Sequence, residues 1–395
     1  MLQTIDIFLK RTSNKVGLFI AIYLLFALAI AVTRLPFLFS LKNLTVPISM
    51  LLCREILFFS FLGFLIMFST ERRYLLSLVG LCGIIAAQSL TEGQDPQLIV
   101  YGFRSLLTFL FIFCLPSQQR GFRVNSGVID KVLIGLFFVN LFLQLTHFFL
   151  GNGFYAKLFW LNVNSRNPGF FFFPAASAFF TLVLFSLYAS TKKILKKRET
   201  LFMIFSVGLC ASITGVAGAG LMIFLNRRKM TMRNLVIAGI ALGLAAGYLH
   251  LARLSMTGNT YLEETGGGRI KVFQEVMTSA SLFDVGRFGK YTNVAANLTN
   301  GGVADSQYSA TVGNLGFFWA MVVFLYMAWL IYQNYKSGEN LDVIWLLLLC
   351  SFGLNVSETG PPVFLAILGR FIQTSNSSDK LVEFHGFEAR NDSSG

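Results

Sequence analysis

Charged residues are scarce in this chain. Asp, Glu, Lys and Arg together make up 13% of its 395 residues, about half of the quarter that is usual in soluble domains. Hydrophobic residues make up 55%, including 43 phenylalanines, and the mean hydropathy is +0.65. Even large soluble domains bury only about three quarters of the surface of the unfolded chain. The composition therefore excludes a soluble enzyme and a disordered chain, and it predicts a protein whose main solvent is lipid.

Cysteine, histidine and the common metal motifs are also few or missing. The five cysteines lie within apolar runs without short spacing, which excludes a disulfide framework and a thiolate metal site. The sequence has three histidines and no Asp-x-Asp, His-Glu-x-x-His, P-loop or Gly-x-Ser-x-Gly motif. This argues against a metal-dependent nucleotide-sugar transferase and a zinc protease. We expect neither a metal ion nor a cofactor.

Long apolar runs, in contrast, are abundant. A helix needs roughly 20 mostly apolar residues to cross a bilayer. We expect spans at about 16–37, 45–69, 74–90, 97–116, 131–150, 170–191, 235–253, 310–334, 342–357 and 360–373. The pattern predicts an all-α polytopic membrane protein, and no internal repeat is visible between its two halves.

Basic residues gather between the apolar runs, at 10–15, 72–73, 120–123, 192–198, 227–233 and 336. Such clusters usually mark cytoplasmic loops, so the net charge of +13 is no argument for nucleic-acid binding. Because 192–198 and 227–233 are both strongly basic, we expect a short hairpin between them, about 200–212 out and 214–226 back. Gly215, Gly218 and Gly220 would let its two arms pack closely. The total is then about 12 transmembrane helices, with both termini cytoplasmic.

This topology divides the chain into four parts. Residues 1–253 hold transmembrane helices 1–9, residues 254–309 form a periplasmic loop, residues 310–373 hold helices 10–12, and residues 374–395 form a cytoplasmic tail. Residues 91–96 and 151–169 are the other outside segments. A loop of about 55 residues is too long for a connector alone, and such loops are usually functional.

The long loop contains two ordered features. Arg269 opens a stretch whose apolar residues at 270, 273, 276 and 277 have helical spacing, which predicts an amphipathic helix with Lys271 and Glu275 paired on its wet face. The sequence Gly286-Arg287-Phe288-Gly289-Lys290-Tyr291 follows and predicts a glycine turn with two cations. Such a turn either forms an anion-binding backbone concavity or is a surface turn with solvated charges.

Three arginines are expected in spans or at their mouths. Arg54 falls in the second span beside Glu55, and Arg104 falls in the fourth. Ionisable residues within a membrane usually face a cavity or a partner, so these residues either serve a site or form a structural ion pair with Glu55. Arg166 precedes the span 170–191, where it can meet a phosphate or cap a helix.

Five short motifs occur in order between residues 100 and 370 and together resemble the O-antigen polymerase and ligase superfamily of membrane glycosyltransferases. Arg166, Gly169 and Pro174 match an Arg-x-x-Gly-x-x-x-x-Pro entry to a middle span. The later motifs are the hairpin turn 212–215, the Arg-x-x-x-aromatic helix of Arg269 and Phe273, the glycine turn of Gly286, Gly289 and Tyr291, and the span start with Asp305, Ser306, Tyr308, Gly313 and Gly316.

The resemblance implies a polymerase at the periplasmic face of a bacterial inner membrane, which transfers a glycan from undecaprenyl pyrophosphate to a lipid-linked repeat unit. Ligases of the superfamily carry a histidine in the loop, whereas this chain has none from 251 to 384. As catalytic residues we expect Arg166, Arg269, Asp305 and Glu275, and as pyrophosphate-binding residues Arg54, Arg104, Gly286, Arg287, Gly289, Lys290 and Tyr291. The expected partners are the bilayer, the lipid-linked glycan and a chain-length regulator. An O-antigen ligase and a secondary transporter or lipid flippase are the alternatives.

Overall fold

The computed structural model describes residues 72–114, 126–159, 174–257, 273–278, 280–283, 285, 288–291, 306–359, 362–367 and 370. Within these ranges the regular structure is helical and no strand occurs, which confirms the all-α prediction for this part of the chain. Among the described residues, five helices are long and apolar enough to cross a membrane: Tyr74–Thr91, Asp130–Leu150, Pro174–Thr191, Met232–Leu251 and Gln307–Lys336. The expected spans 16–37 and 45–69 lie outside the described residues.

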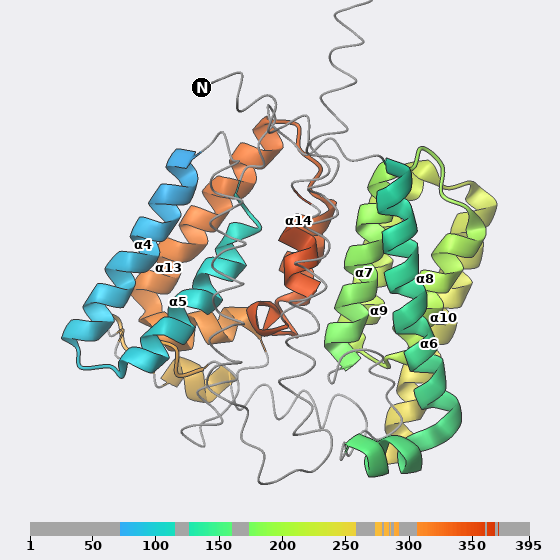
Figure 1. Cartoon of the computed structure of the whole chain (residues 1–395), viewed down its shortest axis with the longest axis horizontal. Helices are drawn as coiled ribbons and strands as arrows, with labels where there is room; N and C mark the ends of the chain where they lie inside the picture. Colours follow the sequence, from blue (N-terminus) through green and yellow to red (C-terminus); the bar gives the residue numbers. More distant parts are fainter. Residues whose placement is uncertain are drawn as a thin grey trace, which may run out of the picture.

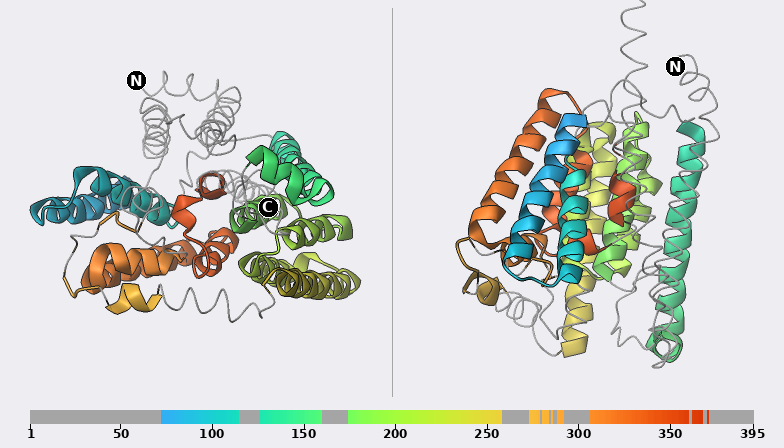
Figure 2. Two further views of the ribbon diagram at one scale, coloured as in Figure 1. Left: turned by 90° about the horizontal axis from the view of Figure 1, so that it is seen from below. Right: turned by 60° about the vertical axis from the view of Figure 1, so that its left-hand side comes forward.

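The helices form two groups (Figure 1). One group holds α4 (Arg72–Thr91), α5 (Pro96–Phe111) and α13 (Gln307–Lys336), and the other holds α6 (Ser126–Phe159), α7 (Pro174–Thr191), α8 (Lys197–Leu209), α9 (Ile213–Leu225) and α10 (Met232–Thr257). Helix α14 (Asp342–Cys350) contacts α7 and α9, and η3 (Val356–Glu358) contacts α5. The segment 342–358 therefore joins the two groups, as the view from below also shows (Figure 2).

Helices α8 and α9 form the two arms of a short hairpin. Ser212 caps α9, its side chain accepting a hydrogen bond from the backbone N–H of Gly215. At the open end, the N–H of Leu195 donates to the carbonyl oxygen of Lys229 at 3.0 Å, so the two basic clusters flanking the hairpin lie side by side. Cys210, Ala211 and Ser212 form the turn between the two arms, each of which has 13 residues.

The glycines of α9 serve different contacts from those we expected. A Cβ at Gly215 would stand 3.0 Å from Val207 of the other arm but 2.7 Å from Ala178 of α7. A Cβ at Gly218 would meet Leu182 of α7 at 2.5 Å, and one at Gly220 would meet Leu242 of α10. The glycines therefore bring α9 close to α7 and α10 as well as to α8, because this arm lies in the middle of the group.

Hydrogen bonds between buried polar side chains tie α6, α7 and α8 together. Asn140 and Gln144 of α6 donate to the hydroxyl of Ser177 at 3.1 and 3.0 Å, and Ser206 of α8 donates to Gln144 at 2.7 Å. The Thr181 hydroxyl lies 3.0 Å from that of Ser206. Interhelical hydrogen bonds of this kind add to packing in lipid, where burial in itself contributes little. They fix the relative positions of these three helices.

Two helices differ in length from the expected spans. Helix α6 continues to Phe159, through a segment that we expected to be a loop, and its 34 residues correspond to about 51 Å. Helix α14 ends at Cys350, although we expected one span over 342–357. Beyond it, the carbonyl oxygens of Ser351 and Leu354 accept hydrogen bonds from the N–H of Gln307. An unwound backbone is tolerated in a membrane protein where the protein itself satisfies its polar groups.

Candidate functional site

The turn between α4 and α5 supplies polar side chains that bind the long loop. Asp95 caps α5 by accepting a hydrogen bond from the N–H of Gln97 at 2.8 Å, and Pro96 fits the first helical turn because its missing N–H is not needed there. The Glu92 carboxylate accepts the N–H of Val285 at 2.9 Å. Ser89 donates to the Val285 carbonyl oxygen at 3.1 Å. The end of α4 and the turn that follows it therefore bind both the backbone N–H and the carbonyl oxygen of Val285.

The glycine turn of the loop packs directly on α5. Gly289 has a φ of +84°, and a Cβ there would stand 1.8 Å from the carbonyl oxygen of Leu98. On α5, a Cβ at Gly102 would stand 2.7 Å from the backbone nitrogen of Gly289. Glycine at both positions lets the two backbones touch, because there is no room for a side chain between them. The structure gives Gly289 a packing role that neither reading of this turn included, and an anion-binding role stays a prediction.

Tyr291 connects the same turn to α13. Its N–H donates to the side-chain oxygen of Asn314 at 2.9 Å. Its ring lies 2.8 Å from the position that a Cβ on Gly313 would occupy. Val276, from the loop helix 273–278, lies against the same glycine, with its side chain 3.2 Å from that Cβ position. Val276 is buried, whereas Phe273 and Glu275 on this helix are exposed.

Helix α13 breaks at Gly316, which has a φ of +69° and a ψ of 177°. A new helix start exposes backbone N–H groups that need acceptors. Here the N–H groups of Phe317 and Phe318 donate to the carbonyl oxygens of Ser281 and Leu282, at 3.1 and 3.0 Å. The loop thus supplies the hydrogen-bond acceptors that the break requires. The expected span 310–334 consists of two helical pieces joined at Gly316.

The first piece of α13 is buried and polar. Gln307, Ser309, Thr311 and Asn314 are all buried. The side-chain oxygen of Gln307 accepts the N–H of Ser357 at 3.0 Å, and the Ser357 hydroxyl lies 2.5 Å from that of Ser105 on α5. Ser357 also donates to Asn355 at 2.9 Å. This network joins α5, α13 and η3 beside the loop, and buried polar networks with satisfied partners specify one arrangement of a core.

The structure describes five of the expected site residues. Glu275 and Lys290 are exposed, Gly289 is buried, and Tyr291 is half-buried. Arg104 is half-buried on α5, with its guanidinium carbon 5.7 Å from the centre of the Tyr101 ring. The remaining residues, Arg54, Arg166, Arg269, Gly286, Arg287 and Asp305, lie outside the described residues. The loop residues that are described converge on α5 and on the break in α13, while a grouping of the arginines stays a prediction.

Sequence reasoning missed Gln307, Asn314 and Ser357 as site-forming residues. The signal was present, since 306–314 reads Ser-Gln-Tyr-Ser-Ala-Thr-Val-Gly-Asn, an unusually polar start for a membrane span. It also missed Arg370, which is buried and donates to the Asn340 carbonyl oxygen at 2.7 Å and to the side chain of Asn334. Asn334 in turn donates to the Phe113 carbonyl oxygen, so Arg370 organises the far end of α13.

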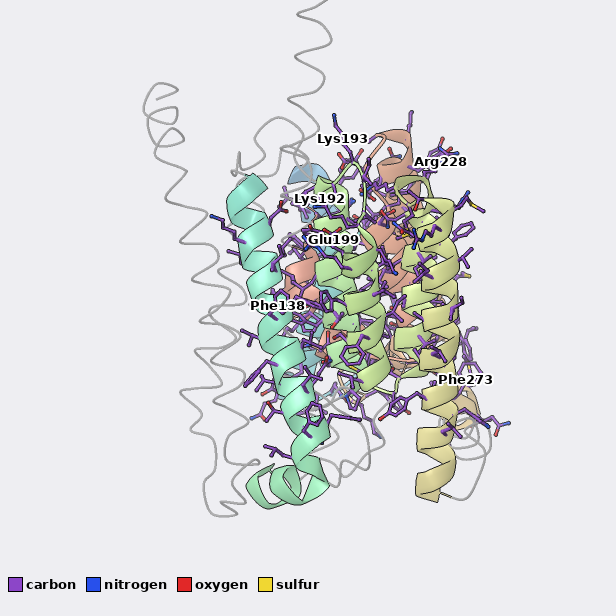
Figure 3. The ribbon with its side chains drawn as sticks, turned by 90° about the vertical axis from the view of Figure 1, so that its right-hand side faces the viewer. Phe138, Lys192, Lys193, Glu199, Arg228 and Phe273 are labelled. Carbon is purple, nitrogen blue, oxygen red and sulfur yellow. The ribbon has the colours of Figure 1, made fainter. Side chains whose placement is uncertain are left out.

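The two ends of the bundle differ in chemistry. Lys192, Lys193 and Arg228 gather at one end, and Phe273 of the loop helix lies toward the other (Figure 3). Among the described residues, no group of three or more His, Cys, Asp or Glu side chains is placed to hold a metal ion. Comparison of the chain with known protein families, with curated proteins and with solved structures finds no match in any of the three.

Proposed function

We propose that this protein is a polysaccharide polymerase of the O-antigen type in a bacterial inner membrane. It has about 12 transmembrane helices, and its loop over 254–309 lies on the periplasmic side. There it transfers a glycan from undecaprenyl pyrophosphate to a sugar hydroxyl of a second lipid-linked repeat unit. A chain-length regulator is its expected protein partner.

One observation carries the proposal: three of the five motifs that suggested this activity meet at one place. Val276 of the loop helix 273–278 and the ring of Tyr291 from the glycine turn both approach the same Cβ position on Gly313 at the span start, and the Tyr291 N–H donates to Asn314. The three motifs are short and follow one another between residues 269 and 316, and their packing at the start of α13 is the arrangement expected of a shared site.

The distribution of charge supports the orientation. Basic clusters favour the cytoplasmic side of a membrane, and those at 192–198 and 227–233 adjoin each other. The loop docks at the α4–α5 turn and at the start of α13, toward the other end (Figures 1 and 3). An acceptor site on the periplasmic side follows from this reading of the charges.

The chemistry of the reaction fits the residues of the loop. The acceptor hydroxyl attacks the anomeric carbon, the bond from this carbon to the pyrophosphate oxygen breaks, and undecaprenyl pyrophosphate departs with the bonding electrons. Preorganised cations stabilise the developing negative charge, and arginine suits this because its guanidinium binds phosphate oxygens in pairs. Arg166 and Arg269 are assigned this role, with Arg54, Arg104 and Arg287 in support. The hydroxyl proton passes to a carboxylate, for which Asp305 and Glu275 are the candidates.

A transporter or lipid flippase is the second candidate, and the break in α13 favours it. Discontinuous helices with buried polar residues form substrate sites in many secondary transporters, and the piece from Gln307 to Gly316 is buried and polar. Against this reading, the sequence lacks the internal repeat that many transporters show. The break is also satisfied by loop carbonyl groups, which leaves it no backbone donors for a substrate at Phe317 and Phe318.

Purified protein in liposomes separates the two functions. Lipid-linked repeat unit, isolated from cells that lack this protein, is added from the outer side of the liposomes only. A polymerase produces a ladder of longer lipid-linked glycans and releases undecaprenyl pyrophosphate, whereas a flippase moves the substrate across the bilayer without lengthening it. Translocation without any longer product would contradict the proposal.

A further inference from the structure

A groove at the basic end of the bundle lies between α6, α7 and α8, away from the loop. Its volume is about 330 Å³, and its apolar wall includes Ile134 and Phe138 of α6, Leu184 of α7 and Phe202 of α8. Ile134, Phe138 and Phe202 are 41%, 49% and 43% exposed. Since these helices cross or border the membrane, the open side of the groove meets lipid rather than water.

The groove is polar at one end only. Tyr188, Arg198 and Glu199 line it where α7 ends and α8 begins. About one helical turn deeper along α8, the rings of Phe138 and Phe202 meet edge to face, with centres 6.1 Å apart. Figure 3 shows Glu199 close to the basic end and Phe138 farther along the bundle. This gradient, from charged to aromatic along the helix axis, matches a lipid that extends from its headgroup into its acyl chain.

The two carboxylates at this end are already engaged. Glu199 accepts the Tyr188 hydroxyl at 2.9 Å and the backbone N–H of Lys196 at 2.8 Å. Asp130 pairs with Lys192 and accepts the Thr191 hydroxyl at 3.0 Å. Both acids therefore serve to fix the α7–α8 link.

Positive charge remains in excess around the mouth of the groove. The link 192–198 contains five basic residues, and Lys193, Lys196, Lys197 and Arg198 are exposed. Within the described part of the chain these four side chains form no ion pair. A basic pocket between membrane helices is the usual receptor for an anionic lipid headgroup, and the groove beneath gives the attached chain an apolar lining.

We propose that this groove binds one anionic phospholipid of the surrounding leaflet, with its phosphate at Arg198 and one acyl chain along Ile134, Phe138 and Phe202. Arg198 presents a planar fork that binds phosphate oxygens in pairs, and the lysines of the link add a general attraction. The hydrogen bonds that join α6, α7 and α8 keep the groove formed before lipid enters, which lowers the cost of binding. This site is independent of the proposed glycan transfer.

Native mass spectrometry of the full chain, titrated with phosphatidylglycerol or phosphatidylcholine, tests the proposal. We expect one tightly retained phosphatidylglycerol and much weaker retention of phosphatidylcholine. Arg198→Gln should weaken the first binding step about fivefold, the effect of removing one basic contact near a lipid surface. The matched control is Arg228→Gln, which removes a charge from the neighbouring exposed cluster, outside the groove, and should leave that step unchanged.

A second pair of variants tests the apolar half of the site. Ile134→Trp places a large ring in the groove and should abolish the tight step, while Ile240→Trp, on the exposed face of α10, should retain it. Equal retention of the two lipids, or equal losses in Arg198→Gln and Arg228→Gln, would overturn the proposal in favour of a diffuse positive field. If Ile134→Trp does not fold, the comparison of Arg198→Gln with Arg228→Gln still tests the proposal, because both arginines are exposed and their substitution leaves the packing of the helices intact.

Discussion

Gly289 and Leu98 lie so close together that a Cβ at position 289 would stand 1.8 Å from the carbonyl oxygen of Leu98. The long loop and α5 therefore meet backbone to backbone, next to the point where Tyr291 reaches α13. A glycine that the sequence marked as a candidate for binding anions is, in the structure, one of the points at which the loop packs on the helices.

The first prediction concerns this contact. Gly289→Ala should destabilise the protein by about 2–4 kcal/mol, because alanine at positive φ is strained and its methyl group overlaps α5. Thermal unfolding of the purified protein in detergent measures the effect. Gly239→Ala in α10, where a Cβ would meet nothing within 4 Å, is the matched control and should be neutral or slightly stabilising, because alanine favours a helix more than glycine does. Equal stability of the two variants would mean that the loop does not dock as described.

The second prediction concerns the polar start of α13. Gln307→Leu removes the acceptor of the Ser357 N–H, and a buried donor without an acceptor costs about 1–3 kcal/mol. Gln333→Leu is the control, since that side chain makes no hydrogen bond within the described residues. We expect a lower unfolding temperature for Gln307→Leu alone. Unchanged stability would show that the network is dispensable.

The third prediction concerns membrane topology. Reporters fused after Arg198 and after Arg233 should both report the cytoplasm, because both flanks of the α8–α9 hairpin are basic and adjoin each other. A reporter fused within 258–272 should report the periplasm. If the fusion after Arg233 reports the periplasm instead, the long loop changes sides and the proposed function loses its compartment.

The fourth prediction concerns the arginines. Arg166→Lys and Arg269→Lys should each lose most polymerisation activity at equal expression, because lysine keeps the charge but not the paired hydrogen bonds. Asp305→Asn and Glu275→Gln, measured in the same assay, identify which carboxylate takes the proton. Full activity of both lysine variants would leave only a diffuse positive field in place of a bidentate phosphate site.

The fifth prediction concerns metal ions. Polymerisation should survive EDTA, because arginines can neutralise the charge that Mg²⁺ or Mn²⁺ neutralises in other transferases. High salt should reduce substrate capture more than EDTA does, since exposed charges are screened over about 8–10 Å at physiological ionic strength. Loss of turnover in EDTA and its recovery with Mg²⁺ would contradict an arginine-only site and direct attention to Asp284 and Asp305.

The expected spans agree well with the helices wherever apolar length alone decides. Spans expected at 74–90, 131–150 and 235–253 correspond to the apolar segments Tyr74–Thr91, Asp130–Leu150 and Met232–Leu251 of α4, α6 and α10, and the hairpin expected from basic flanks corresponds to α8 and α9. The agreement has a simple cause: a bilayer of fixed thickness demands a run of fixed length. Basic clusters carry a similarly local signal, because each loop is sorted by its own charge.

Composition along the chain therefore determined that the described residues form helices, several of them long and apolar enough to cross a membrane, and charge determined a hairpin whose two basic flanks lie side by side. Only the tertiary structure decided where helices break, as at Gly316 and after Cys350, because those breaks depend on hydrogen-bond partners far away in sequence, Ser281 and Leu282 for the first and Gln307 for the second. It also decided that Gly289 packs on Leu98. The hydrophobic periodicity of a segment does not indicate which distant backbone groups will form hydrogen bonds with it. Those hydrogen bonds form only when the helices assemble.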